Sequence, residues 1–228
     1  MPHIAKYLIN GHPAPSVNNV TDLLPKPWLL NWYNSHAKKA CEQLRNIGGP
    51  NYEPWVNAAI RELEFCDKRS KESRELGTDV HEAFEIFLKK GYANKHQKFI
   101  TGLETWLKSG ITIVAVEPHI ESLKYEFHGS PDLIAERHDG KLVVYDYKIK
   151  ERPPDFKTIL NETGYAICWN ETHTERIEVI GILRFHPETG KMLTPLYYDI
   201  KQEWIDAFLL LRETLKVAKV GEKWGRQK

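Results

Sequence analysis

The chain has 228 residues, of which 41% are hydrophobic and 28% charged, and its formal net charge is +1. These values are ordinary for a soluble globular protein, and the length fits one large domain with a substantial core. The near-neutral charge excludes a global basic field, so binding to a polyanion would need local patches. No apolar run approaches transmembrane length, and the N-terminus lacks the apolar core of a signal peptide.

The three cysteines, Cys41, Cys66 and Cys168, are widely spaced and odd in number. They form neither a disulfide framework nor a Cys-x-x-Cys metal knuckle. A reduced cytoplasm is therefore the natural setting, with no membrane involved.

The first third of the chain predicts a mainly helical elaboration, covering residues 1–73. A short strand is expected at 4–9, and an apolar stripe at helical spacing indicates a helix between 23 and 44. A glycine- and proline-rich turn at 48–50 separates it from a second helical stretch at 51–65. The stripe suits core packing, although Trp32 or Tyr33 could instead stack on a nucleobase.

A charged segment follows, and four of its residues are basic: Lys68, Arg69, Lys71 and Arg74. Such a run is either a solvated loop or helix face, or a contact to a phosphate backbone. The sequence leaves both interpretations open.

The next helix is expected to begin near Thr78 and to end at Gly91, with acidic residues in its first turn and lysines in its last. Its apolar positions are Val80, Phe84, Phe87 and Leu88. His81 borders this inward stripe, where a histidine is often only a hydrogen-bonded core residue. The helix lacks the second histidine of a zinc-protease motif.

A helix at 96–107, a strand at 111–116 that leads to Glu117, and a strand at 121–128 are predicted next. Gly129 and Ser130 then allow the backbone to approach the following segment closely.

That segment predicts a β-hairpin, with strands at 131–135 and 141–149 around an Asp-Gly turn. Alternation places Asp146 and Lys148 on one face, at the end of a strand whose start is apolar, and brings Asp132 across the ladder. Two carboxylates suit Mg²⁺ or Mn²⁺, and an adjacent amine suits the hydrolysis of a phosphodiester. The alternative is a surface hairpin with one Asp–Lys pair, worth a few tenths of a kcal/mol.

The ordered set of Pro131-Asp132, Asp146-Tyr147-Lys148 and an upstream Gly77-x-x-x-His81 resembles the PD-(D/E)XK nuclease superfamily, most closely its RecB-like exonuclease branch of phages and bacteria. The resemblance covers roughly residues 74–169. It implies an α/β fold with a restriction-endonuclease-like core, in which a small central mixed sheet is flanked by helices. The whole chain, 1–228, would be one nuclease domain, with a catalytic core at 74–200 and a C-terminal helix and tail at 201–228.

The resemblance also implies roles for individual residues. His81, Asp132, Asp146 and the carbonyl of Tyr147 would bind one or two Mg²⁺ or Mn²⁺ ions, and Lys148 would orient or activate water. Glu117 would orient a metal-bound water or serve a second ion, unless it is a surface acid before a turn. The four-cysteine iron–sulfur cluster of CRISPR-associated relatives is not expected, because only three cysteines are present.

Beyond the hairpin, Lys150 and Arg152 form a basic stretch, and a residue at 155 can cap a helix at 156–169. RecB-like nucleases carry Gln-x-x-x-Tyr on this helix, and the corresponding pair here is Asn161 and Tyr165. Asn161 and Tyr165 would bind substrate by resemblance, and Lys150 and Arg152 would do so as basic residues, although Tyr165 could equally be a core residue. Strands at 177–185 and 192–198 and a helix at 202–220 complete the chain.

The function expected from these residues is a metal-dependent deoxyribonuclease, an exonuclease acting on single- or double-stranded DNA ends in processing, recombination or repair. It would work in the cytoplasm of a bacterial or phage-infected cell, with a recombination or replication protein as a further partner. The alternative is a subunit that keeps the nuclease fold, has lost the chemistry, and only binds nucleic acid or a partner.

Overall fold

A computed structural model describes residues 7–24, 39 and 53–225. The chain divides into two compact units, one formed by residues 1–24 together with 80–228 and the other by residues 25–79. The predicted helix at 23–44 and the turn at 48–50 lie outside the described residues, apart from positions 23, 24 and 39. The predicted single-domain organisation stays a prediction.

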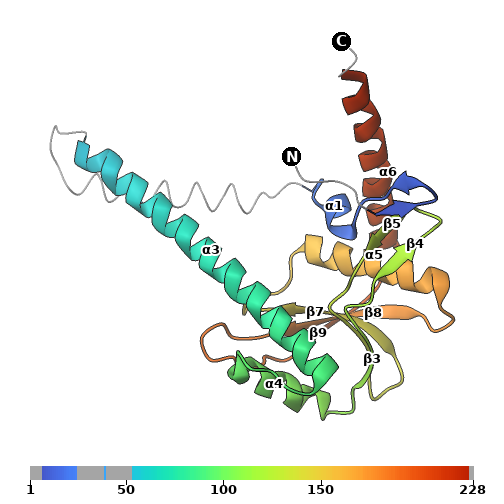
Figure 1. The fold of residues 1–228 in the computed structure, drawn as a ribbon, viewed down its shortest axis with the longest axis horizontal. Coiled ribbons are helices and arrows are strands. Elements are labelled where there is room, and N and C mark those ends of the chain that lie inside the picture. The colour runs from blue at the N-terminus through green and yellow to red at the C-terminus, as the bar shows by residue number, and fades with distance from the viewer. Residues whose placement is uncertain (1–6, 25–38, 40–52, 226–228) are drawn as a thin grey trace. The chain divides into compact units, whose positions relative to one another are not determined.

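The first unit is built on a five-stranded mixed sheet (Figure 1) with strand order β3-β6-β7-β8-β9. The β7–β8 pair is parallel and the other three pairs are antiparallel. The strands are β3 (Thr112–Val116), β6 (Leu133–Glu136), β7 (Leu142–Lys148), β8 (Ile177–Arg184) and β9 (Leu196–Asp199). The parallel pair needs a crossover, and helix α5 (Phe156–Thr172) supplies it. The predicted central mixed sheet flanked by helices is confirmed.

Helices cover both faces of this sheet, with α5 on one side and α4 (Gln97–Leu107) on the other in Figure 1. On the α4 side, Trp106 packs against Tyr145, and Phe84 packs against Tyr147, with ring centroids 4.9 Å apart in each pair. Because side chains alternate along a strand, the even-numbered residues of β7 face α5.

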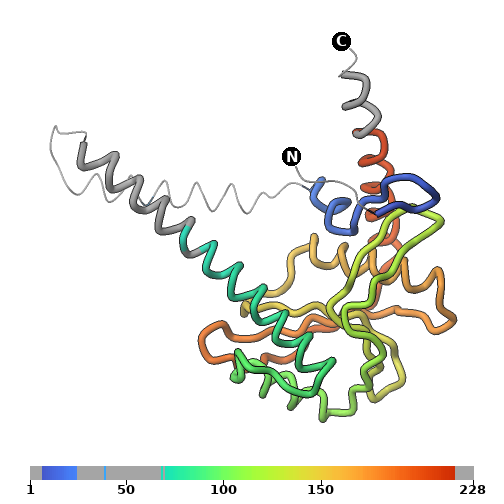
Figure 2. Tube along the Cα trace, in the orientation of Figure 1, coloured from blue at the N-terminus to red at the C-terminus, as the bar shows by residue number. Residues whose placement is uncertain are grey.

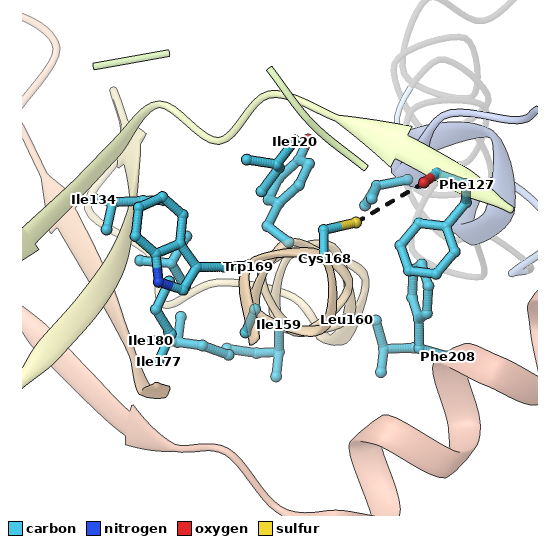
Figure 3. Close-up of a cluster of buried hydrophobic side chains, with 14 of the residues drawn as sticks. Ile120, Phe127, Ile134, Ile159, Leu160, Cys168, Trp169, Ile177, Ile180 and Phe208 are labelled. Carbon is cyan, nitrogen blue, oxygen red and sulfur yellow. Dashed lines mark hydrogen bonds between the residues drawn. The ribbon is translucent and has the colours of Figure 1, made fainter. Parts of the chain in front are cut away.

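A cluster of buried hydrophobic side chains lies between the sheet and α5, as the close-up in Figure 3 shows. Val144 and Ile180 of the sheet, Ile159 and Leu160 of α5, and Phe208 of the C-terminal helix α6 (Gln202–Gly225) are buried there. Burial of such side chains stabilises each by about 1.5–3 kcal/mol relative to exposure. This core fixes α5 over the end of β7 that carries Asp146.

Segments from both ends of the chain close this side of the unit. Figure 2 shows the short helix α1 (Val17–Thr21), in blue, beside α6, in red. Two small hairpins lie in the same unit, β1 (Leu8–Ile9) with β2 (His12–Pro13), and β4 (Ile120–Ser122) with β5 (Phe127–Gly129). Of the strand predicted at 4–9, only the end at Leu8–Ile9 is found among the described residues.

The helix predicted to begin near Thr78 begins much earlier, because α3 runs without a break over Glu53–Lys90. Thr78 does not cap it, since its hydroxyl donates to the carbonyl of Arg74 at 3.1 Å. A single glycine at 77 weakens a helix by about 1 kcal/mol and does not end it. The exposed pairs Lys68–Glu72 and Lys71–Glu75, at 3.9 and 3.8 Å, show that the charged run is part of the helix.

The single strand predicted at 121–128 is also wrong, because strands β4 and β5 form a hairpin there. The backbone turns at Glu126, where φ is +54°. Glu171 of α5 holds the turn by accepting from Ser122 Oγ at 2.5 Å and from the Lys124 backbone N–H at 2.8 Å. In the part of the chain that the structure describes, no helix is long and apolar enough to span a membrane.

Candidate metal and nucleic-acid site

The β6–β7 hairpin brings Asp132, Asp146 and Lys148 to one end of the sheet, as the sequence predicts. Its turn has the expected positive φ at Gly140, +78°, and Leu133 pairs with Tyr145. Asp132 Oδ2 accepts from the Tyr147 backbone N–H at 2.9 Å, which fixes its carboxylate beside the end of β7. Asp146 Oδ1 and Lys148 Nζ are 2.5 Å apart on the α5 face of the strand.

His81 reaches the same end of the sheet from helix α3. Its Nε2 lies 3.0 Å from the Tyr147 carbonyl oxygen, and its Nδ1 lies 3.3 Å from Asp132 Oδ1. The buried side chains of Val80 and Phe84 anchor this turn of the helix, and the ring of Phe84 packs against that of Tyr147. Three of the four groups predicted as metal ligands, His81, Asp132 and the Tyr147 carbonyl, are therefore brought into contact, while the Asp146 carboxylate contacts Lys148 instead.

The histidine faces an oxygen acceptor at each ring nitrogen. A neutral imidazole can donate a hydrogen bond from only one of them. One of the two contacts is thus unfavourable unless the ring is protonated or a cation intervenes. Burial lowers the pKa of His81, but the hydrogen bond and the charge of Asp132 outweigh it, so the net pKa is raised.

Asp146 and Lys148 form a partly buried ion pair at this end of the sheet, but Lys148 satisfies only one oxygen of the Asp146 carboxylate. Burial raises the pKa of Asp146, although the neighbouring Lys148 opposes the shift. Burial lowers the pKa of Lys148, but the charge and hydrogen bond of Asp146 raise it more. The net pKa of Lys148 is therefore above its ordinary value. Asp146 Oδ2 is buried and has no hydrogen-bond partner among the described residues. An unpaired buried carboxylate oxygen is costly, so the site favours either a proton or a further cation at this oxygen.

Sequence reasoning missed a further acid, Glu162 of α5, which is 2% exposed. Its Oε2 also has no hydrogen-bond partner in the described part of the chain. Burial, followed by the charges of Asp146 and Asp132, raises its pKa well above the usual value. A signal was available, because Glu162 lies on the apolar stripe of the predicted helix, three residues from both Ile159 and Tyr165.

Glu117 directly follows β3 and lies beside Asp132. Its backbone N–H donates to the Asp132 carbonyl oxygen at 3.1 Å, and its φ is +47°, a left-handed conformation uncommon outside glycine. Burial, and then the charges of Glu85 and Asp132, raise the pKa of its carboxyl group. Glu85 itself pairs with Lys89 at 2.6 Å.

Tyr165 and Asn161 are neighbours one turn apart on α5, but they make different contacts. Tyr165 is 7% exposed, and its ring lies over Gly129, where an added Cβ would be 2.5 Å from Tyr165 Cε1. Asn161 holds α1 instead, since its Oδ1 accepts from Thr21 Oγ1 at 2.6 Å and its Nδ2 donates to Asn18 Oδ1 at 2.7 Å. A substrate contact by Asn161 stays a prediction and would have to replace these bonds.

The basic residues after β7 differ in exposure. Lys150 is partly buried, and burial lowers its pKa while Asp155 opposes the shift. Arg152 is exposed. Their contact with substrate stays a prediction.

Among the described residues, no three His, Cys, Asp or Glu side chains stand in a geometry that would hold a metal ion as placed. Several donor atoms instead contact each other or an ammonium group, His81 facing Asp132 and Asp146 facing Lys148. The donor chemistry nevertheless fits, because carboxylate and carbonyl oxygens with one imidazole suit Mg²⁺ or Mn²⁺. The unpartnered oxygens of Asp146 and Glu162 point to the same need for a cation.

No protein-family model matches this sequence, and no curated protein sequence matches it. Among solved structures, an alkaline exonuclease from Laribacter hongkongensis has 12% identity and a TM-score of 0.42, covering 94% of this chain and 95% of its own. A second structure of that exonuclease, in complex with dAMP, has 14% identity and a TM-score of 0.29, covering 66% and 86%. Likeness at this level carries no argument about fold or function.

Proposed function

We propose that the chain is a metal-dependent deoxyribonuclease, in which His81, Asp132, Asp146 and the Tyr147 carbonyl hold Mg²⁺ or Mn²⁺. The observation that carries this proposal is the convergence of His81, from a helix, on the Asp132–Tyr147 end of the hairpin, within 3.0 and 3.3 Å. When bound, a divalent cation supplies charge stabilisation for phosphodiester hydrolysis.

Lys148 has the position of a group that orients water or a phosphate oxygen. Asp146 holds its ammonium on one side, and the side chain is 26% exposed, so a second partner can reach it. A positioned ammonium beside a reacting phosphate stabilises the charge that develops on the phosphate oxygens. The carboxylate of Glu117, at the same end of the sheet, orients the attacking water or serves a second ion.

DNA is the proposed substrate, and its ends are the proposed point of attack, in agreement with the motif resemblance to RecB-like exonucleases. Lys150 and Arg152 would contact the phosphate backbone, and Tyr165 would line the approach beside Asp132. Non-specific phosphate contacts of this kind weaken as salt concentration rises. The role that follows is DNA processing in recombination or repair.

End-labelled linear and circular DNA, single- and double-stranded, tests the proposal when incubated with Mg²⁺, Mn²⁺ or a chelator. Asp146→Asn and Lys148→Met should each lower metal-dependent degradation, by at least on the order of 10²-fold for Lys148→Met. Linear DNA should be degraded and circular DNA spared, because an exonuclease needs an end.

Lys141→Met is the matched control, since Lys141 is exposed and immediately precedes the same strand at its opposite end. It should leave degradation unchanged. Full activity in both Asp146→Asn and Lys148→Met would contradict the proposal. DNA binding by the unmodified protein without cleavage, under either metal, would instead favour the inactive binding subunit.

A further inference from the structure

Glu162 is a buried acid whose position on α5 is not explained by packing. Its side chain is 2% exposed in a helix whose neighbouring buried residues are Ile159, Thr163 and Ala166. Its Oε2 has no hydrogen-bond partner within the described ranges. A carboxylate in such a place costs several kcal/mol unless it is neutralised by protonation or by a partner.

The groups that interact electrostatically with Glu162 are Asp146, Asp132 and Lys148. All three belong to the same end of the β6–β7 hairpin. Asp146 Oδ2 is the second buried carboxylate oxygen in this cluster without a partner among the described residues. Lys148 is the ammonium whose charge acts on Glu162, but its hydrogen bond goes to Asp146 Oδ1 at 2.5 Å. The existing contacts therefore leave oxygens of both acids without a donor.

The charges of the cluster identify the kind of partner that is needed. Asp132, Asp146 and Glu162 carry three negative charges when ionised, and Lys148 carries one positive charge, so the formal sum is −2 with His81 neutral. A single divalent cation brings the cluster to neutrality. Oxygen donors in this number suit a hard cation such as Mg²⁺ or Mn²⁺.

We propose that Glu162 is a ligand of the divalent cation, an oxygen donor that α5 adds to the set provided by His81 and the hairpin. This inference rests on the proposed metal-dependent function and extends it to a residue outside the Asp132 and Asp146-x-Lys148 motifs. The helix that crosses the sheet would then do more than cover the core, because Glu162 would supply an oxygen donor to the ion.

Mn²⁺ titration of the full chain by calorimetry, without DNA, tests the role of Glu162 independently of activity. Glu162→Gln should weaken Mn²⁺ binding by about 10–100-fold or more, the range found when a metal's supporting groups are lost. Without metal, the variant should melt at the same temperature as the unmodified protein or higher, because an amide replaces an unpartnered buried acid. The rise in Tm on adding Mn²⁺ should shrink.

Glu171→Gln is the matched control on the same helix, since Glu171 has protein partners in Ser122 and Lys124. It should leave Mn²⁺ affinity unchanged. Glu162→Asp gives a second variant in case the amide prevents folding, and it should bind Mn²⁺ more weakly than the unmodified protein while keeping the charge.

The outcomes separate this inference from the proposed function. Equal Mn²⁺ affinity in Glu162→Gln and the unmodified protein would mean a protonated structural acid and would overturn the inference, while the nuclease proposal would stand. Weakened Mn²⁺ binding in a protein that cleaves no DNA would support the inference and overturn the nuclease proposal. An unmodified protein that binds neither Mn²⁺ nor Mg²⁺ would overturn both.

Discussion

The contact between Gly129 and Tyr165 links the backbone that leads to Asp132 with the helix that carries Glu162. A Cβ at Gly129 would lie 2.5 Å from Tyr165 Cε1 and 3.2 Å from Cδ1. Ordinary contact begins near 3.4 Å, so Gly129→Ala requires the ring or the strand to move by at least 0.9 Å, the difference between 3.4 and 2.5 Å. Tyr165 is only 7% exposed and has little room to yield.

Gly129→Ala should therefore lower the free energy of unfolding by about 1–3 kcal/mol, the usual cost of overpacking a well-packed site. Replacing Tyr165 by leucine removes the ring atoms that collide with the new methyl group. In a Tyr165→Leu background the same Gly129→Ala change should cost clearly less. The double-mutant cycle should thus give a coupling energy of about 1 kcal/mol or more.

Urea unfolding of the four proteins measures this coupling, with midpoints compared at equal m-values. An equal cost of Gly129→Ala in both backgrounds would refute the reasoning, because the ring would then not be the obstacle. The single variant should also weaken DNA binding if Tyr165 lines the approach to the site as proposed.

Two further predictions concern elements that hold the site in place. Asp155→Ala should destabilise the protein by about 0.5–2 kcal/mol, because Asp155 Oδ1 caps α5 by accepting from the Thr158 N–H at 2.9 Å and its hydroxyl at 2.8 Å. Burial alone would raise the pKa of Asp155, but the Thr158 bonds and Lys150 lower it below the ordinary value. The ionised cap therefore contributes fully above the unfolded pKa of about 3.9 and is lost as pH falls through the lower folded value. The free energies of unfolding of the protein and of Asp155→Asn should therefore differ at neutral pH and become equal in acid. A difference that stays constant with pH would count against an ionised cap. Gly181→Ala should cost about 1–3 kcal/mol, because its Cβ would collide with the buried ring of Tyr145, which Trp106 packs against at 4.9 Å; an unchanged urea midpoint would show that the ring can move.

The hairpin could be predicted from the sequence because its signals are local. An Asp-Gly turn and a strict alternation of side chains fix which residues share a face, and the structure has the expected register. The position of His81 could not be derived this way, since its contacts at 3.0 and 3.3 Å join distant parts of the chain. Only the resemblance of the whole motif set indicated it.

The predicted helix start near Thr78 and the predicted strand at 121–128 were wrong for different physical reasons. A threonine near glycine resembles a helix start at residue 78. The helix α3 instead continues through the preceding charged segment, where Lys68 pairs with Glu72 and Lys71 pairs with Glu75 at i,i+4 spacing. At 121–128 the alternation of Leu123, Tyr125 and Phe127 resembles a strand. The hairpin found there depends on a carboxylate from α5, at 2.8 Å from the Lys124 N–H, which no local pattern reveals.

Glu162 was missed although the same physical argument that singled out Asp146 applies to it. Asp146 stood out because a charge at the end of an apolar strand is costly without a partner. Glu162 sits on the apolar stripe of a helix with helical spacing to Ile159 and Ala166, so its burial implies the same cost. Two such charges on elements that pack against each other imply a shared partner, and Lys148 alone leaves their oxygens unpaired. If the Mn²⁺ titration bears out the role proposed for Glu162, an acid on the apolar stripe of a crossover helix would be a signal for a cation site that the amino-acid sequence alone can supply.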